Sequence, residues 1–103
     1  MKIEILYFRE CPNHEEAERR IRVVLAELGR SADVVRVEVL DDATAARLRF
    51  PGSPTIRVDG KDIVPEGTLG PYRLSCRVYS TVSGLSGAPE MEPIRAAVQR
   101  NVE

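Results

Sequence analysis

Residues 7–14 read Tyr-Phe-Arg-Glu-Cys-Pro-Asn-His, and this stretch turns an apolar strand into an amphipathic helix. Residues 2–8 alternate at first and then become continuously apolar, which is typical of a strand covered on both faces. We therefore expect this strand to lie inside a sheet. Cys11 falls where the first unpaired N–H groups of the helix point, and their partial positive charge favours a thiolate over a thiol. Cys11 is the first candidate for chemistry.

The helix after Cys11 is predicted by the spacing of its apolar residues. These recur three and four positions apart and stop at Gly29; they are Ala17, Ile21, Val24, Leu25 and Leu28. Two N-terminal caps are compatible with the sequence. Either Asn13 caps the helix with Glu16 three residues on, or Cys11 is the cap and Pro12 takes the first helical position.

The middle of the chain carries local signals for four more elements. They are a strand at 34–40, a short helix capped by Asp41-Asp42, an extended run at 55–58 and a return strand at 61–64. Asp59-Gly60 between the last two is a strong hairpin signal. The pair Asp41-Asp42 is better explained as a helix cap than as an acid-base or metal pair.

The last third of the chain is less regular. Residues 89–101 have helical spacing, whereas 65–88 form an insertion punctuated by glycine and proline, within which 74–82 fit a helix, an added strand or an ordered loop. The order is strand, helix, strand, helix, strand, strand, helix. This order predicts an α/β fold with a small mixed sheet, one parallel crossover and helices on both faces.

Length and composition define the class of protein. With 103 residues, 43% hydrophobic and 30% charged, the chain is expected to form one globular domain, 1–103. A net charge of -1 without basic runs argues against nucleic acid or an anionic membrane as partner. No long apolar segment or leader pattern is present, so a cytoplasmic protein is expected. In that compartment two cysteines indicate reactive, metal-binding or buried thiols rather than a structural disulfide. The sequence does not fix the oligomeric state.

A strand followed by Cys-Pro-x-x at a helix start, with Gly-Ser-Pro-Thr at 52–55 before a hairpin, resembles the thioredoxin-like superfamily, close to its glutaredoxin-sized members. The chain is also similar to small bacterial thioredoxin-like proteins with a Cys-Pro-Asn-His or similar motif. The resemblance implies a three-layer α/β/α fold with a mixed four-stranded sheet. The insertion near 65–88 has no obvious counterpart in a minimal glutaredoxin.

The resemblance also implies a substrate-binding strip beside Cys11. In the family a cis-proline lies next to the reactive cysteine, which makes Ser53-Pro54 the expected cis bond. Pro12, Ser53, Pro54 and Thr55 are then the residues expected to align a substrate chain.

His14 occupies the position where the family has its second cysteine, so a dithiol mechanism within the motif is impossible. A protonated His14 would stabilise a Cys11 thiolate, and a neutral one would act as a base or metal ligand. The alternative is an exposed residue of the first helical turn without a role.

Cys76 lies in the insertion, and two interpretations of it stay open. In a thioredoxin-like arrangement this connection can pass the sheet edge that holds Cys11, which would make Cys76 a resolving thiol; Arg73 or Arg77 would then favour its thiolate. Alternatively, Cys76 is a small buried hydrophobe, as free cysteines often are.

Three functions follow, and whether the chain is an enzyme stays open among them. The first is a thiol-disulfide oxidoreductase in which the Cys11 thiolate attacks a protein or small-molecule disulfide, with Cys76 or an external thiol such as glutathione as resolver and no further cofactor. The second is a soft-metal module that holds mercury, arsenite, copper or zinc through Cys11, Cys76 and His14. The third is a redox-inactive thioredoxin-like scaffold that binds a partner.

Overall fold

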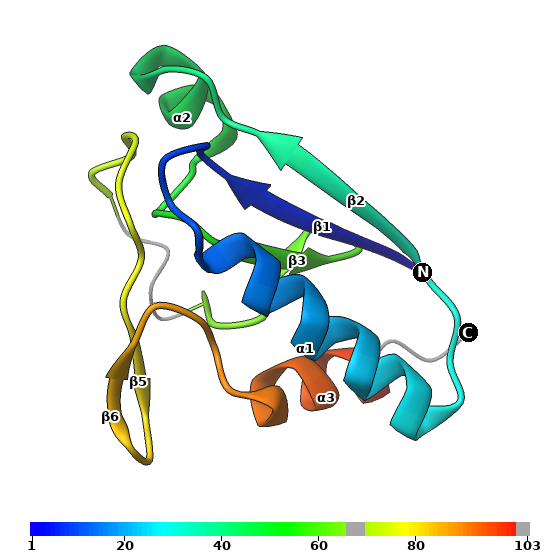
Figure 1. Ribbon diagram of the computed structural model, residues 1–103. Coiled ribbons are helices and arrows are strands. Elements are labelled where there is room, and N and C mark those ends of the chain that lie inside the picture. Colours follow the sequence, from blue (N-terminus) through cyan, green and yellow to red (C-terminus); the bar gives the residue numbers. More distant parts are fainter. Residues whose placement is uncertain (66–69, 101–103) are drawn as a thin grey trace.

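The computed structural model describes residues 1–65 and 70–100 (Figure 1). Its helices and strands are β1 (Lys2–Tyr7), α1 (Asn13–Leu28), β2 (Asp33–Glu38), α2 (Asp42–Leu48), β3 (Thr55–Val58), β4 (Lys61–Asp62), β5 (Tyr79–Thr81), β6 (Gly84–Ser86) and α3 (Met91–Arg100). The predicted order is confirmed from β1 to β4 and at α3. The insertion supplies the β5–β6 hairpin, and the expected end of the last helix at residue 101 lies outside the described residues.

Four strands form a mixed sheet in the order β2-β1-β3-β4. β1 pairs in parallel with β2 and antiparallel with β3, so the first strand is internal, as predicted. The β3–β4 turn has positive φ angles at both central residues, 48° at Asp59 and 85° at Gly60. Such a turn matches the twist of the two strands that it joins, which explains why Asp-Gly predicted this hairpin.

Successive side chains of β1 point to opposite faces of the sheet, and each face has its own core. Ile3 and Ile5 pack with residues of α1 and α3, among them Ile21 and Ile94. Leu6 packs on the other face with three further buried residues, Val39, Ala45 and Phe50. The helices therefore lie on both faces of the sheet, α1 and α3 on one and α2 on the other (Figure 1).

The start of α1 corrects both predicted caps. The residue before the helix is Pro12, and no side chain caps the first N–H groups. The Asn13 amide donates instead to the Cys11 sulfur at 3.7 Å, and the Cys11 thiol contacts the Ser53 carbonyl at 3.5 Å. Both candidate capping side chains are thus engaged in contacts other than a cap. The predicted stop at Gly29 is confirmed, since this residue takes the left-handed conformation (φ 62°) that glycine adopts without steric cost.

Asp41 caps α2, as predicted, and this bond gives a pH dependence. Its Oδ1 accepts from the Thr44 N–H at 2.7 Å. Hydrogen bonding to the Thr44 side chain, and then to this N–H, lowers the pKa of Asp41 from its usual 3.8. A lowered pKa means that the stabilisation is present above the unfolded-state value and is lost as the pH falls through the folded-state value. We expect the Thr44 amide proton to titrate below pH 3.8 by NMR. Asp41→Asn keeps an acceptor and should abolish that titration; a Thr44 signal that still titrates there in Asp41→Asn contradicts the assignment.

Candidate functional site

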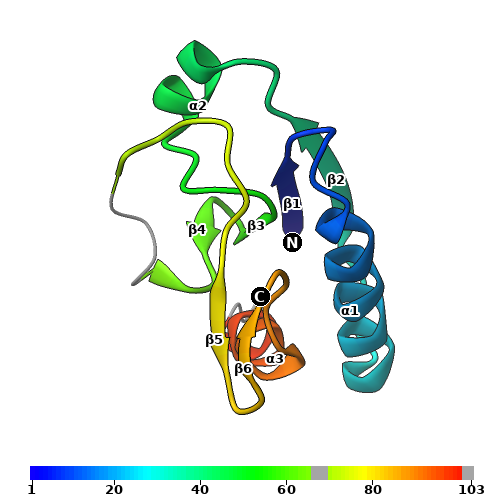
Figure 2. The same ribbon diagram turned by 60° about the vertical axis from the view of Figure 1, so that its left-hand side comes forward.

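Residues 73–78, a segment of the insertion, cross the loop that precedes β3 in the sequence. We call this segment the strap. Figure 2 shows it running from beside α2 past β3 to β5. The Ser53 N–H donates to the Ser75 carbonyl at 2.7 Å, and the Arg77 N–H donates to the Ser53 carbonyl at 2.8 Å. These two bonds make a parallel bridge between Ser53 and Cys76. The backbone of Ser53 therefore pairs with the chain's own strap.

The strap is fastened on both sides of Cys76. Before it, the Leu74 N–H donates to Asp42 Oδ1 at 2.9 Å, and the Leu74 side chain packs on the Phe50 cluster. After it, the Tyr79 hydroxyl donates to the Pro54 carbonyl. Burial raises the pKa of Tyr79 well above its usual range, although the nearby Arg77 cation opposes this. The neutral hydroxyl thus remains a donor at any physiological pH.

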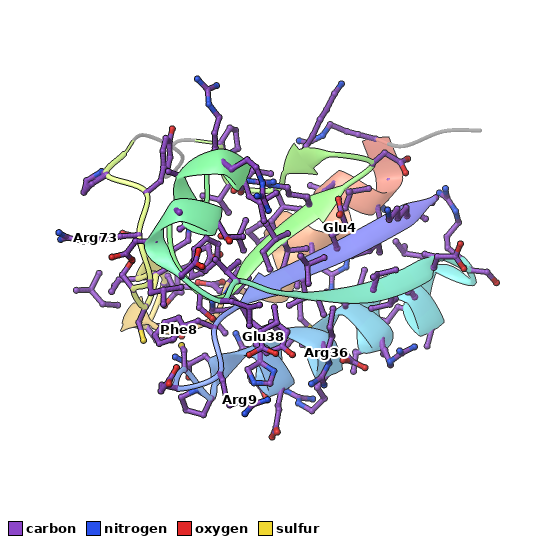
Figure 3. All side chains as sticks on the ribbon, turned by 90° about the horizontal axis from the view of Figure 1, so that it is seen from above. Glu4, Phe8, Arg9, Arg36, Glu38 and Arg73 are labelled. Atoms are coloured by element: carbon purple, nitrogen blue, oxygen red, sulfur yellow. The ribbon has the colours of Figure 1, made fainter. Side chains whose placement is uncertain are left out.

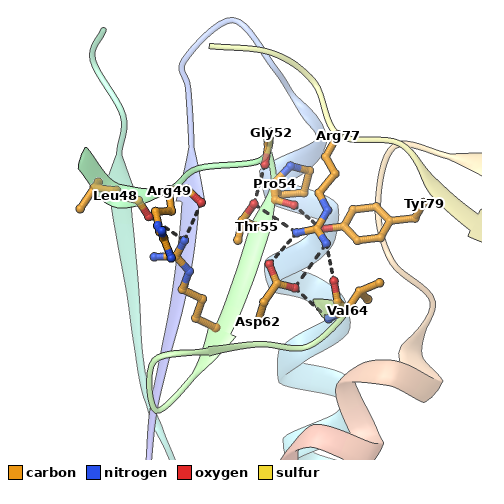
Figure 4. A network of polar contacts seen from close by, with 10 residues as sticks. Leu48, Arg49, Gly52, Pro54, Thr55, Asp62, Val64, Arg77 and Tyr79 are labelled. Carbon is orange, nitrogen blue, oxygen red and sulfur yellow. Dashed lines mark hydrogen bonds and ion pairs between the residues drawn. The ribbon is translucent and has the colours of Figure 1, made fainter. Parts of the chain in front are cut away.

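Arg77 provides the strongest fastening (Figure 4). Its guanidinium donates to both carboxylate oxygens of Asp62, at 2.8 and 3.3 Å, and to the Val64 carbonyl at 2.7 Å. It also stacks over the Tyr79 ring, 4.7 Å from the centroid. The two charged side chains are only 5% and 7% exposed, so the pair is shielded from water. The sequence placed Arg77 as a possible partner of a Cys76 thiolate, whereas the structure engages it with Asp62.

The strap brings Cys76 onto Cys11, and the two sulfurs lie 3.2 Å apart. Cys11 is fully buried, whereas Cys76 is exposed. The Cys76 S–H donates to the Cys11 sulfur, and this bond, together with partial burial, raises the pKa of Cys76 above its usual value. Two thiols that are 65 positions apart in the sequence thus form one site.

Asn13 is a member of this site that the sequence assigned only as a possible cap. Its amide lies between the Cys11 sulfur and the backbone of Gly87, where a Cβ atom would lie 2.3 Å from the Asn13 nitrogen. The close approach of Gly87 thus leaves room for the amide to reach the sulfur. The local signal for this contact is weak, being only the position of Asn13 two residues after Cys11.

His14 lies away from this contact network. Its ring packs on Tyr7 with centroids 4.3 Å apart, and its Nδ1 lies 3.3 Å from an Arg36 nitrogen. Arg36 extends from β2 toward α1 (Figure 3), where it also pairs with Glu18 at 2.6 Å. No hydrogen bond joins His14 to either cysteine in the part of the chain that the structure describes. Within residues 1–65 and 70–100, no group of three or more His, Cys, Asp or Glu side chains is placed to hold a metal.

The four residues expected to align a substrate are near Cys11 but mostly covered. The Ser53-Pro54 bond is cis, as the resemblance implied. Ser53, Pro54 and Thr55 are all buried, and the Thr55 hydroxyl donates to the Gly52 carbonyl at 2.6 Å. Pro12 alone is exposed. The polar groups of this strip are therefore satisfied within the chain itself.

Comparisons with protein families, curated proteins and solved structures find no match to this chain. Among the residues that the structure describes, no helix combines the length and the apolar character needed to cross a bilayer.

Proposed function

We propose that this chain is a thioredoxin-like thiol-disulfide oxidoreductase in which Cys11 and Cys76 alternate between a dithiol and a disulfide. The observation that carries the proposal is the distance of 3.2 Å between their sulfurs. A disulfide requires about 2.05 Å, so roughly one ångström of side-chain adjustment suffices. The fold supports the thioredoxin-like assignment through its parallel β1–α1–β2 unit, its antiparallel β3 and the contact of Cys11 with the Ser53 carbonyl in the loop before β3.

The overall reaction balances with one external disulfide. The two protein thiols give up two electrons and two protons and form the Cys11–Cys76 bond, while the external disulfide takes up both and is released as two thiols. The second cysteine, missing from the Cys-Pro-Asn-His motif, is thus supplied from the strap. His14 needs no role in this exchange.

The test is the oxidation of reduced protein by oxidised glutathione. We expect loss of both free thiols and of the mass of two hydrogen atoms, without a lasting glutathione adduct. Because the bond links residues 65 positions apart, it should raise the free energy of unfolding by roughly 4 kcal/mol in the chain-entropy description, measured as a urea midpoint with and without reductant.

Cys76→Ser is the matched control, since it should show no difference between the two urea midpoints. Both Cys11→Ser and Cys76→Ser should also lose disulfide reductase activity. If the wild-type protein keeps two free thiols or stops at a glutathione adduct, the dithiol cycle is refuted and the redox-inactive scaffold is favoured.

A further inference from the structure

The two cysteines differ in their exposure to solvent, and this difference bears on which sulfur exchanges first with an external disulfide. Cys11 is 0% exposed and is enclosed by the Ser53 carbonyl, the Asn13 amide and Cys76 itself. Cys76 is exposed on the strap. Exchange needs an in-line approach of one sulfur to another, so the accessible sulfur reacts first.

The strap shows no sign of acting as a lid that opens over Cys11. It is bonded to Ser53 through both Ser75 and Arg77, and Arg77 is further held by the buried Asp62 carboxylate. A substrate chain that paired with the Ser53 backbone would have to break all of these bonds. Backbone groups held by several such bonds separate only in opening reactions whose free energy approaches that of unfolding a larger part of the protein.

We propose that Cys76, not Cys11, is the sulfur that exchanges with external thiols and disulfides, and that buried Cys11 is its internal partner. This inference rests on the dithiol cycle proposed above and reverses the order that the sequence favoured. It also means that the external reactant meets the strap from solvent without pairing with the Ser53 backbone.

When the protein is oxidised, the Cys76 thiolate attacks one sulfur of an external disulfide and releases the other half of that disulfide as a thiolate. The Cys11 sulfur, as a thiolate, then attacks Cys76, forms the internal disulfide and releases the second external thiolate; the two protein protons end on the released thiols. In the reducing direction, an external thiolate attacks Cys76, and Cys11 leaves with the electron pair beside the Asn13 amide. A second external thiolate then attacks the outer sulfur of the mixed disulfide and frees Cys76.

The test compares Cys11→Ser and Cys76→Ser. Each variant keeps one thiol and replaces the other cysteine by a serine of similar size. Each variant is mixed with an aromatic disulfide that releases a coloured thiolate. We expect Cys76 in Cys11→Ser to react at least about 100-fold faster than Cys11 in Cys76→Ser, because a buried thiol reacts only through opened states. In denaturant both variants should react at similar rates, which shows that the native fold causes the difference. Cys76→Ala repeats the measurement with a second variant.

The order would be overturned if Cys11 in the native protein reacted as fast as Cys76 or faster. That outcome is distinct from failure of the dithiol cycle, which is judged on the wild-type protein by its internal disulfide. A peptide map of Cys11→Ser treated with oxidised glutathione provides a direct check. It should place the adduct on Cys76.

Discussion

Gly52→Ala is expected to push the strap off Ser53 and to slow formation of the Cys11–Cys76 disulfide. Gly52 has φ 140°, a region that L side chains rarely adopt, and an added Cβ would lie 2.9 Å from the backbone nitrogen and the Cβ of Arg77. Both obstacles belong to a strap segment whose position is fixed by its bonds to Ser53 and Asp62. We expect the free energy of unfolding to fall by roughly 2–5 kcal/mol, from backbone strain and overpacking together.

The rate of disulfide formation in Gly52→Ala distinguishes a displaced strap from a general loss of stability. With the Ser53–Arg77 bond broken, Cys76 no longer faces Cys11, and oxidation by glutathione should close the disulfide at least about tenfold more slowly. The measurement follows the loss of free thiols with time under conditions where the variant remains folded.

Gly84→Ala is the matched control for this variant. Gly84 also has a positive φ, 114°, but an added Cβ there meets nothing within 4 Å. The control should therefore carry the backbone strain without the clash and close its disulfide at the wild-type rate. If Gly52→Ala also oxidises at the wild-type rate, the strap does not position Cys76.

The parts of the fold that could be predicted are those with local signals. The apolar run of β1, the spacing in α1 and the Asp59-Gly60 turn each depend on residues close in sequence, and all three are confirmed. The cis Ser53-Pro54 bond came from the resemblance alone, because most X-Pro bonds are trans.

The strap could not be predicted in the same way, because it is held by contacts between distant segments. Its two bonds to Ser53 join residues 22 and 24 positions apart, and such a bridge leaves no periodic pattern in the sequence. The predicted caps of α1 were wrong for a related reason, since the Cys11 thiol turns toward the distant Ser53 carbonyl and the Asn13 amide donates to the Cys11 sulfur. The sequence did place Cys76 as a candidate partner of Cys11, but it left a buried cysteine as an open alternative.

Arg77→Met is expected to destabilise the protein strongly. Methionine fills a similar volume but leaves the Asp62 carboxylate, which is 7% exposed, and the Val64 carbonyl without the guanidinium donors. Removing one partner of a buried ion pair costs about 3–5 kcal/mol, mainly because the remaining charge is left uncompensated. We expect a loss of this size in the free energy of unfolding, measured in urea for the reduced protein.

Two companion variants distinguish the buried pair from a general effect of losing an arginine. Arg77→Lys keeps the charge but not the fork that bonds both Asp62 oxygens, so an intermediate loss is expected. Arg95→Met removes a surface arginine paired with Glu27 and Glu92 and should change stability little, because solvent screens such pairs. Equal losses in Arg77→Met and Arg95→Met would contradict the assignment, since Arg77, unlike Arg95, joins the strap to the sheet through a carboxylate that is only 7% exposed.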